Sequence, residues 1–330
     1  MLTTEQPIIS VVIPCRNEFN FIEICIQSLI EQTYPKEKIE IIVVDGISDD
    51  GTREKIQALQ KHHSRLIIAD NPQKRTPVAL NIGARLASGE IIIILGAHTR
   101  VDKRFIELNT RYMREKDVKC VGGTQYNEGL TYWQKAIGLA MSSRWGIPSA
   151  PYRFSQTAGY VDTVVYAAYH RSLFDEIGYF DEELRISEDA EFNWRIRKAG
   201  YKIWFSPDII TWYYPRATLE RFIRQFFNYG ILRVNVIKKH PDAWKWIHLL
   251  PAILFLATGI LAILAIFNSI CFLSLLLVCL FYLIYLILAS LFTGFKKKHY
   301  QFIPTLPLLF SSMQLSWVCG FLVGILNKNR

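Results

Sequence analysis

The sequence lacks the signatures of several common functional classes. Its six cysteines never form a Cys-x-x-Cys pair, which argues against a zinc or dithiol redox site and suits a reducing compartment. It has no Gly-x-x-x-x-Gly-Lys-Ser/Thr loop, so a P-loop nucleotide site is excluded. Recognition-helix, zinc-finger and RNA-binding motifs are also missing, so nucleic acid is not expected as a partner despite a formal charge of +9.

Charged residues are absent from Leu249 to Phe295, and a further uncharged run extends from Phe302 to Leu326. A membrane span needs roughly 20 apolar residues. We therefore predict a transmembrane region at 247–330, with spans at about 247–267, 270–293 and 303–326. The first two would turn at Asn268 and Ser269. Pro304 and Pro307 leave a re-entrant last segment as an alternative.

The N-terminus does not resemble a signal peptide, since "MLTTEQPIIS" has neither a basic start nor a long apolar run. We expect a multi-pass protein of the inner or plasma membrane, with its soluble domain in the cytoplasm. The basic loop "KKKHY" after the second predicted span agrees, because basic loops stay on the cytoplasmic side.

The first 125 residues alternate apolar strands with helical patterns. "IISVVIP", "IEIIVVD", "RLIIAD" and "EIIIILG" are separated by helices of roughly 10–15 residues. This order predicts an α/β domain at 1–215, a doubly wound parallel sheet with helices on both faces. Ligands of such sheets bind beyond the carboxyl ends of the strands.

Polar side chains occur where each of these strands ends. Arg16 and Glu18 follow the first strand, Asp45 the second, Asp70 the third and His98 the fourth. Because parallel strands end at one edge of the sheet, these groups are expected to surround a polar ligand.

A short helix is predicted in "SEDAEFNWRIRKAG". Ser187 is the expected N-cap, Glu188 and Asp189 lie in the first turn where the helix dipole favours negative charge, and Gly200 ends the helix.

The segment 216–246 is rich in basic and aromatic residues and directly precedes the first predicted span. Single-stranded nucleic acid is one ligand for such a segment. Its position next to a span favours instead a membrane-interface segment in contact with the lipid bilayer.

Five motifs, in this order, resemble glycosyltransferase family 2: "VVIPCRNEFNFIEICIQSLIEQTYP", "IIVVDGISDDGT", "ALNIGARLASGE", "VVYAAYHRSLFDEIGYFDEE" and "SEDAEFNWRIRKAGYKI". The tail "SSMQLSWVCGFLVG" is similar to the subgroup of succinoglycan and exopolysaccharide glucosyltransferases. The resemblance implies a GT-A fold that binds a nucleotide-diphospho-sugar, followed by transmembrane α-helices.

The resemblance also implies roles for individual residues. Asp189 would be the general base, with Glu188 beside it, and Asp45 would contact the nucleoside together with Glu18 and Asp50. The remaining residues expected to bind the nucleotide sugar are Pro14, Arg16, Arg75, Asn81 and Ala97.

Members of this family usually carry Asp-x-Asp after the fourth strand, where it holds Mg²⁺ or Mn²⁺ against the diphosphate. Here the triplet is Gly96-Ala97-His98. Either His98 is the protein's metal ligand, or cations such as Arg75, Arg224 and Arg233 stabilise the diphosphate in its place. A purely structural His98 is the third interpretation.

The sequence thus predicts a membrane-bound inverting transferase that uses a UDP-sugar. Its acceptor would be a polyprenyl-diphosphate-linked sugar or a glycan in cell-surface or exopolysaccharide biosynthesis. A strict Gln-x-x-Arg-Trp element is missing, which argues against processive synthesis. The alternative is a catalytically weak, nucleotide-sugar-binding subunit of a membrane polysaccharide-assembly complex. A nucleotidyltransferase is disfavoured because no glycine-rich N-terminal triphosphate loop occurs.

Overall fold

The computed structural model describes residues 6–147, 150–184, 188–244 and 246–327. The chain divides into two compact units. The first comprises the described parts of residues 1–127 and 149–214, and the second those of 128–148 and 215–330. Residues 128–148 were expected in the N-terminal domain but group with the C-terminal helices.

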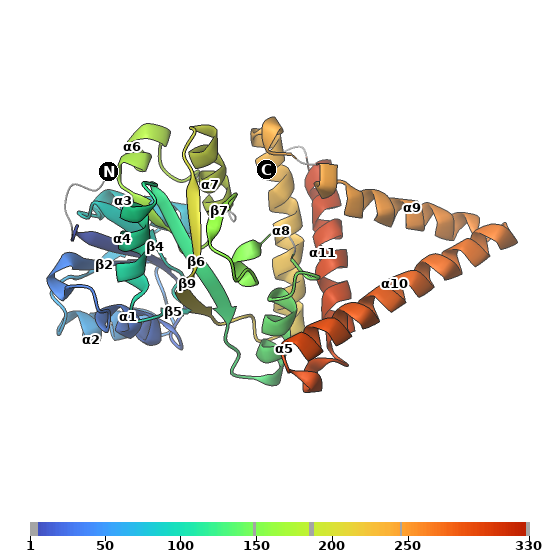
Figure 1. The fold of residues 1–330 in the computed structure, drawn as a ribbon, viewed down its shortest axis with the longest axis horizontal. Coiled ribbons are helices and arrows are strands. Elements are labelled where there is room, and N and C mark those ends of the chain that lie inside the picture. Colours follow the sequence, from blue (N-terminus) through green and yellow to red (C-terminus); the bar gives the residue numbers. More distant parts are fainter. Residues whose placement is uncertain (1–5, 148–149, 185–187, 245, 328–330) are drawn as a thin grey trace. The chain divides into compact units, whose positions relative to one another are not determined.

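A nine-stranded sheet forms the centre of the first unit, with its main path in the order β3-β2-β1-β4-β8-β6-β9-β5 (Figure 1). Four strands are parallel, as predicted: β1 (Ile9–Cys15), β2 (Ile39–Asp45), β3 (Leu66–Asp70) and β4 (Ile91–Ile94). Their apolar, β-branched sequences suit strands that are covered on both faces.

The other half of the sheet is mixed. β8 (Ala168–His170) is antiparallel to both β4 and β6 (Cys120–Asn127), while β9 (Ile203–Tyr213) is parallel to β6. Two short strands, β5 (Thr99–Val101) and β7 (Gly159–Val161), pair antiparallel with β9. Strands of three residues are too short to show a hydrophobic period, so the sequence pattern did not reveal them.

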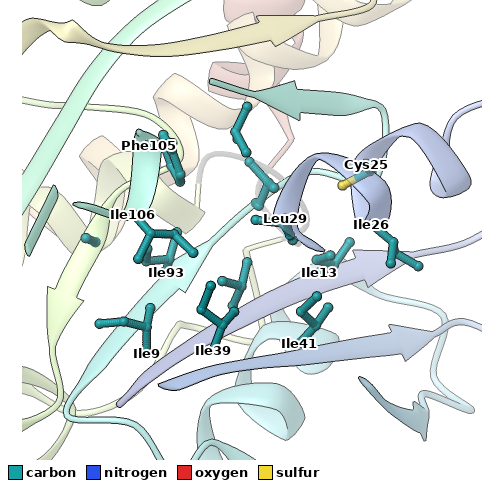
Figure 2. Packing of buried hydrophobic residues seen from close by; sticks show 14 of the residues in the cluster. Ile9, Ile13, Cys25, Ile26, Leu29, Ile39, Ile41, Ile93, Phe105 and Ile106 are labelled. Atoms are coloured by element: carbon teal, nitrogen blue, oxygen red, sulfur yellow. The ribbon is translucent and has the colours of Figure 1, made fainter. Parts of the chain in front are cut away.

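One face of the sheet packs against α1 (Ile22–Ile30), α2 (Thr52–Gln60) and α4 (Phe105–Glu115). Figure 2 shows Cys25 and Leu29 of α1 lying over Ile13 and Ile93 of the strands, with Phe105 of α4 beside them. These side chains are buried. Burial of each large apolar side chain stabilises the fold by about 1.5–3 kcal/mol, so this packing fixes where β1 and β4 end.

The opposite face is covered by α3 (Thr76–Leu86), α6 (Ser172–Ile177) and α7 (Glu188–Lys198). The ring of Phe192 on α7 lies 4.6 Å from that of Phe180 and 5.1 Å from that of Tyr169 on β8. Offset and edge-to-face aromatic contacts add about 0.5–1.5 kcal/mol per pair to the burial term. This aromatic cluster holds α7 against the centre of the sheet.

The second unit is helical. It contains α5 (Tyr132–Met141), α8 (Leu219–Lys239), α9 (Leu250–Leu264), α10 (Ser269–Lys296) and α11 (Leu306–Leu326). The described residues of the two units also form five short 3₁₀ turns: η1 (Lys36–Lys38), η2 (Pro151–Arg153), η3 (Pro241–Ala243), η4 (Trp246–His248) and η5 (Tyr300–Phe302).

Two of these helices, α10 and α11, are long and apolar enough to cross a membrane. α9 has only 15 residues, or about 22 Å, which is short for a hydrocarbon core of roughly 30 Å. The turn expected at Asn268 is present, because the Asn268 side chain accepts a hydrogen bond from the backbone N–H of Ile270 and caps α10.

α8 and α11 run side by side in the second unit (Figure 1), so the basic segment at 216–246 forms part of a helix pair. Glycines permit their close approach. A Cβ added at Gly320 would lie 1.9 Å from the carbonyl oxygen of Phe227, and one at Gly230 would lie 2.1 Å from that of Trp317. At the end of α11, Lys238 Nζ donates hydrogen bonds of 2.7 Å and 2.8 Å to the carbonyls of Gly324 and Asn327, where the helix dipole favours a cation.

We predict that Gly320→Ala destabilises the helix pair, because its methyl group would collide with the α8 backbone. Overpacking of this kind typically costs about 1–3 kcal/mol, more than the roughly 1 kcal/mol gained in helix propensity. Thermal unfolding in one detergent measures the effect. The matched control is Gly259→Ala on α9, where an added Cβ meets no atom within 4 Å. An unchanged or higher melting temperature for Gly320→Ala would contradict the prediction.

Candidate functional site

The loops after β1 and β2 are joined by hydrogen bonds at the carboxyl edge of the sheet. Asn17 N donates to Ser48 Oγ at 2.9 Å, and Asn17 Nδ2 donates to Asp49 Oδ1 at 2.8 Å. Glu18 N donates to Thr52 Oγ1 at 2.9 Å. Asn17 has a φ of 54°, a left-handed conformation that asparagine tolerates better than most residues. The first loop is therefore held in one conformation by the second.

Glu18 joins this pair of loops to the one that follows β4. Its Oε1 atom lies 3.0 Å from Nδ1 of His98, and the two side chains are 20% and 23% exposed. The backbone at His98 is fixed as well, since its carbonyl accepts a hydrogen bond from Tyr214 N, and its ring contacts Tyr213 edge-on. Because Nδ1 of His98 faces the Glu18 carboxylate, Nε2 is the ring nitrogen left for another partner.

Asp45 has no exposed surface, and its carboxylate is taken up by protein groups. Ser48 donates to it from both its backbone N–H and its hydroxyl, and Arg53 Nη1 lies 3.2 Å from Oδ2. The same Nη1 lies 2.6 Å from Oδ1 of Asp70, the residue paired with Asp45 across β2 and β3. The hydrogen bond to Asp70 raises the pKa of Arg53. Direct contact between Asp45 and a nucleoside stays a prediction.

Arg53 is a site residue that the sequence analysis missed. The sequence does contain a signal for this residue, because Asp45 and Asp70 end neighbouring strands. Two carboxylates at adjacent positions repel each other unless a cation lies between them. The Ser48 hydroxyl bonds to Asp45, and the N-cap of α2 is Gly51.

Hydrogen bonds from Phe19 and Thr52 fix the carboxylate of Asp50. Its carboxylate accepts hydrogen bonds from Thr52 N at 3.1 Å and from Phe19 N at 3.2 Å, as well as from the Thr52 hydroxyl. Partial burial opposes ionisation, but the hydrogen bonds from Thr52 and Phe19 outweigh it and lower the pKa of Asp50. Asp50, whose ionised form these hydrogen bonds favour, therefore belongs to the same group of loops as Glu18 and Asp45.

α7 carries the two carboxylates expected to act in catalysis, and its position is fixed by polar contacts. Asn193 Nδ2 donates to Thr163 Oγ1 and to the Val164 carbonyl, both at 2.9 Å, and Asn193 Oδ1 accepts from the buried Tyr169 hydroxyl at 3.3 Å. Arg195 Nη2 donates to the Tyr179 carbonyl at 2.8 Å. The sequence analysis did not predict these positioning contacts.

Glu188 and Asp189 lie in the first turn of α7, and both are partly buried. Asp189 Oδ1 accepts a hydrogen bond from Ala190 N at 2.7 Å. Burial, and then the neighbouring charge of Asp189, raise the pKa of Glu188 to about 8. Ser187 lies outside the described residues. Gly200 ends the helix with a φ of 86°, as predicted.

Asn81 and Arg75 make protein contacts on α3. Asn81 Nδ2 donates to the Phe180 carbonyl and to Glu182 Oε1, both at 2.9 Å, while its Oδ1 accepts from Phe180 N. Arg75 Nη1 donates to the Glu182 carbonyl at 3.1 Å. Both residues therefore attach α3 to the segment before α7, and their contact with a nucleotide sugar stays a prediction.

The other expected binding residues are placed as follows. The exposed Arg16 lies over Gly46, where an added Cβ would approach its stem to 3.2 Å. Pro14 is partly buried near the end of β1, and Ala97 is buried beside His98. Gly46 thus leaves the space that the stem of Arg16 occupies.

Arg224 and Arg233 both lie on α8 of the second unit. Nine residues separate them, which places them on opposite sides of the helix and about 13.5 Å apart along its axis. The two guanidinium groups therefore cannot share one approach to a diphosphate from a single side of α8. A role for either residue alone stays a prediction.

Comparison with known proteins identifies the family. Residues 10–178 match the family model for Glycosyl transferase family 2. The chain is 31% identical over 232 residues to the succinoglycan biosynthesis protein ExoA of Rhizobium meliloti, covering 70% of each chain. It is 30% identical over 238 residues to a Methanococcus voltae enzyme, covering 70% of this chain and 74% of that one. That enzyme is the dolichyl N-acetyl-alpha-D-glucosaminyl phosphate 3-beta-D-2,3-diacetamido-2,3-dideoxy-beta-D-glucuronosyltransferase.

Solved structures show the same fold. The mannosyltransferase PcManGT from Pyrobaculum calidifontis, in complex with GDP-Man and Mn²⁺, superposes with a TM-score of 0.68 at 20% identity, covering 99% of this chain and 89% of that one. TarS 1–349 of S. aureus, in complex with UDP-GlcNAc, gives a TM-score of 0.52 at 20% identity over 69% of this chain and 66% of that one. The predicted GT-A fold is confirmed. With more than half of its residues matched by the family model, this chain belongs to glycosyl transferase family 2 and is a glycosyltransferase.

Proposed function

We propose that this glycosyltransferase is membrane-bound, inverts the anomeric centre, and moves a sugar from a UDP-sugar to a lipid-linked or glycan acceptor in cell-surface polysaccharide synthesis. The hydrogen bonds that join the loops after β1, β2 and β4 through Glu18 and His98 carry the donor part of the proposal. They gather ionisable and polar groups at the sheet edge where open α/β sheets bind ligands.

The transfer itself needs one base. The acceptor hydroxyl oxygen attacks the anomeric carbon, the bond to the diphosphate oxygen breaks, and the hydroxyl proton passes to Asp189. Two adjacent carboxylates resist simultaneous ionisation. The raised pKa of Glu188 means that Glu188 keeps its proton near neutral pH, so Asp189 is the charged member of the pair. Asp189 at a helix start is a weak base, and it therefore takes the proton as attack proceeds.

A metal site would have to be completed by the donor. Among the residues that the structure describes, no group of three or more His, Cys, Asp or Glu side chains is arranged to hold a metal. His98 nevertheless fits as a single ligand, because Glu18 holds Nδ1 and leaves Nε2 for coordination. Mg²⁺ strongly prefers oxygen ligands, so this nitrogen favours Mn²⁺. A bound divalent ion supplies charge neutralisation for the leaving diphosphate.

The second unit supports a membrane-linked acceptor. α10 and α11 qualify as spans, and most apolar side chains of α10 are exposed. The name of the Methanococcus voltae relative describes a dolichyl-phosphate-linked acceptor, and ExoA takes part in succinoglycan biosynthesis. Anchoring the catalytic unit at the cytoplasmic membrane surface, where the basic loop Lys296–Tyr300 would lie, raises the effective concentration of a polyprenyl-diphosphate acceptor.

A second candidate function is a nucleotide-sugar-binding subunit with weak catalysis. The observation that favours it is Gly96, which stands where family members carry the first metal-binding carboxylate. The two functions differ in turnover, since only the enzyme releases UDP in the presence of acceptor.

We predict that Asp189→Asn lowers the rate of UDP release by about 10²–10⁴-fold while UDP binding is retained, because the base is lost. Glu188→Gln, the matched control, keeps near wild-type activity at pH 6.5, where Glu188 already carries a proton.

The wild-type enzyme changes activity as pH rises through about 8, when Glu188 ionises beside Asp189, and Glu188→Gln abolishes that step. Release of UDP or GDP over a panel of UDP- and GDP-sugars between pH 5.5 and 9.5 measures both. Full activity in Asp189→Asn would refute the assignment, and absence of turnover with every donor favours the binding subunit.

For the acceptor, we predict that full-length protein in nanodiscs has at least a tenfold higher kcat/KM for a polyprenyl-diphosphate-linked sugar than for its short-chain, water-soluble analogue. The chemical head is the same in both, so the difference reports only membrane concentration of the acceptor. Initial rates at matched acceptor concentrations measure it. Equal kcat/KM values would show that the membrane helices do not serve acceptor capture.

A further inference from the structure

Tyr166 lies beside the triplet that replaces the expected Asp-x-Asp. β8 runs antiparallel to β4, with Ala168 opposite Ile93 and a hydrogen bond from Ile94 N to the Ala167 carbonyl. This register brings Tyr166 alongside the end of β4. A Cβ added at Gly96 would lie 3.3 Å from Cε1 and 3.4 Å from the hydroxyl oxygen of Tyr166. The space into which an aspartate at position 96 would extend therefore holds the edge of the phenol.

The backbone at Tyr166 is strained. Its φ is 51°, in the left-handed region that glycine occupies freely and that bulky side chains rarely adopt. Residues in such conformations cost about 1–3 kcal/mol and persist where packing holds them, often at functional sites. Tyr166 packs partly against the core on the α1 face of the sheet, and part of its side chain remains exposed. The fold thus maintains a strained tyrosine at the candidate site that a ligand can reach.

A second hydroxyl lies at the same place. Thr99 Oγ1 is 3.4 Å from the point where a Gly96 Cβ would be, and it is buried. Within the described part of the chain it has no hydrogen-bond partner, which is uncommon for a buried hydroxyl. Two hydroxyl groups therefore surround the position of the missing carboxylate.

We propose that Tyr166 takes the place of the first metal-binding carboxylate and that its hydroxyl donates a hydrogen bond to the diphosphate of the donor. This inference rests on the proposed use of a nucleotide-diphospho-sugar. A carboxylate repels a diphosphate unless a cation lies between them, whereas a neutral phenol donates a hydrogen bond to it directly. Gly96 and Tyr166 thus form a coupled pair, in which the absence of a side chain at one position makes room for the ring at the other.

The proposal predicts measurable binding of UDP without metal, and a loss of it in Tyr166→Phe. This substitution removes only the hydroxyl oxygen and keeps the ring that packs on Gly96. A hydrogen bond to a charged group corresponds to roughly a 10- to 150-fold change in affinity. We expect the Kd for UDP to rise by that factor in calorimetry on full-length protein with EDTA. Tyr160→Phe is the matched control, because Tyr160 is an exposed tyrosine of the same unit on β7.

A double variant tests the coupling. Tyr166→Gly removes the ring and suits the positive φ, and Gly96→Asp then restores a carboxylate in the space that is freed. We expect this double variant to bind Mn²⁺ at least tenfold more tightly in the presence of UDP, measured by electron paramagnetic resonance of free Mn²⁺. Its UDP binding should depend on metal. Gly96→Asp alone should gain no Mn²⁺ affinity, because Tyr166 still occupies the space.

Two results would overturn the inference. If Tyr166→Phe binds UDP as tightly as the wild-type protein with and without Mn²⁺, the hydroxyl does not contact the diphosphate, while the proposed transferase stands. If the wild-type protein binds neither UDP nor GDP in any condition, the proposed donor fails and the role of Tyr166 fails with it.

Discussion

The hydrogen bond between Glu18 and His98 is the contact on which the arrangement of the candidate site depends. The backbone of Glu18 is held by Thr52 in the loop after β2, and its carboxylate reaches the loop after β4. One residue thereby fixes the relative positions of three strand ends. The same contact sets which nitrogen of His98 is left for another partner, so it links loop geometry to the chemistry available at the sheet edge.

Strained backbone occurs at strand ends of the candidate site. Asn17, Ile47 and Tyr166 all have φ values above 50° and follow or precede strands that meet at the site. Such conformations are costly, and the buried strands β1, β2 and β4 with their covering helices offset that cost. The packing of the sheet therefore does more than stabilise the fold, because it also holds the binding loops in conformations they would not adopt alone.

The second unit differs from the first in its surface, because its helices expose apolar side chains that a membrane would cover. Small residues permit close packing between α8 and α11, as at Gly230 and Gly320. The basic residues of α8 belong to the segment predicted to lie at the membrane interface. Lys238 also caps the end of α11, so part of the positive charge stabilises the helix pair itself.

Motif order in this sequence was enough to predict the family, the GT-A fold and the strand ends that carry Glu18, Asp45 and His98. The family and the GT-A fold follow from the resemblance of the motifs, whereas the strand ends rest on local patterns, since hydrophobic periodicity and strand-end polarity can be recognised within a single segment. The Arg53 contact between Asp45 and Asp70, the anchoring of α7 by Asn193 and the position of Tyr166 beside Gly96 join residues that are distant in sequence or lie on separate elements. The mixed half of the sheet also escaped prediction, because strands as short as β5, β7 and β8 have no period to detect. Tertiary structure alone decides such features, since they depend on which strand lies beside which and on the space that a missing side chain leaves.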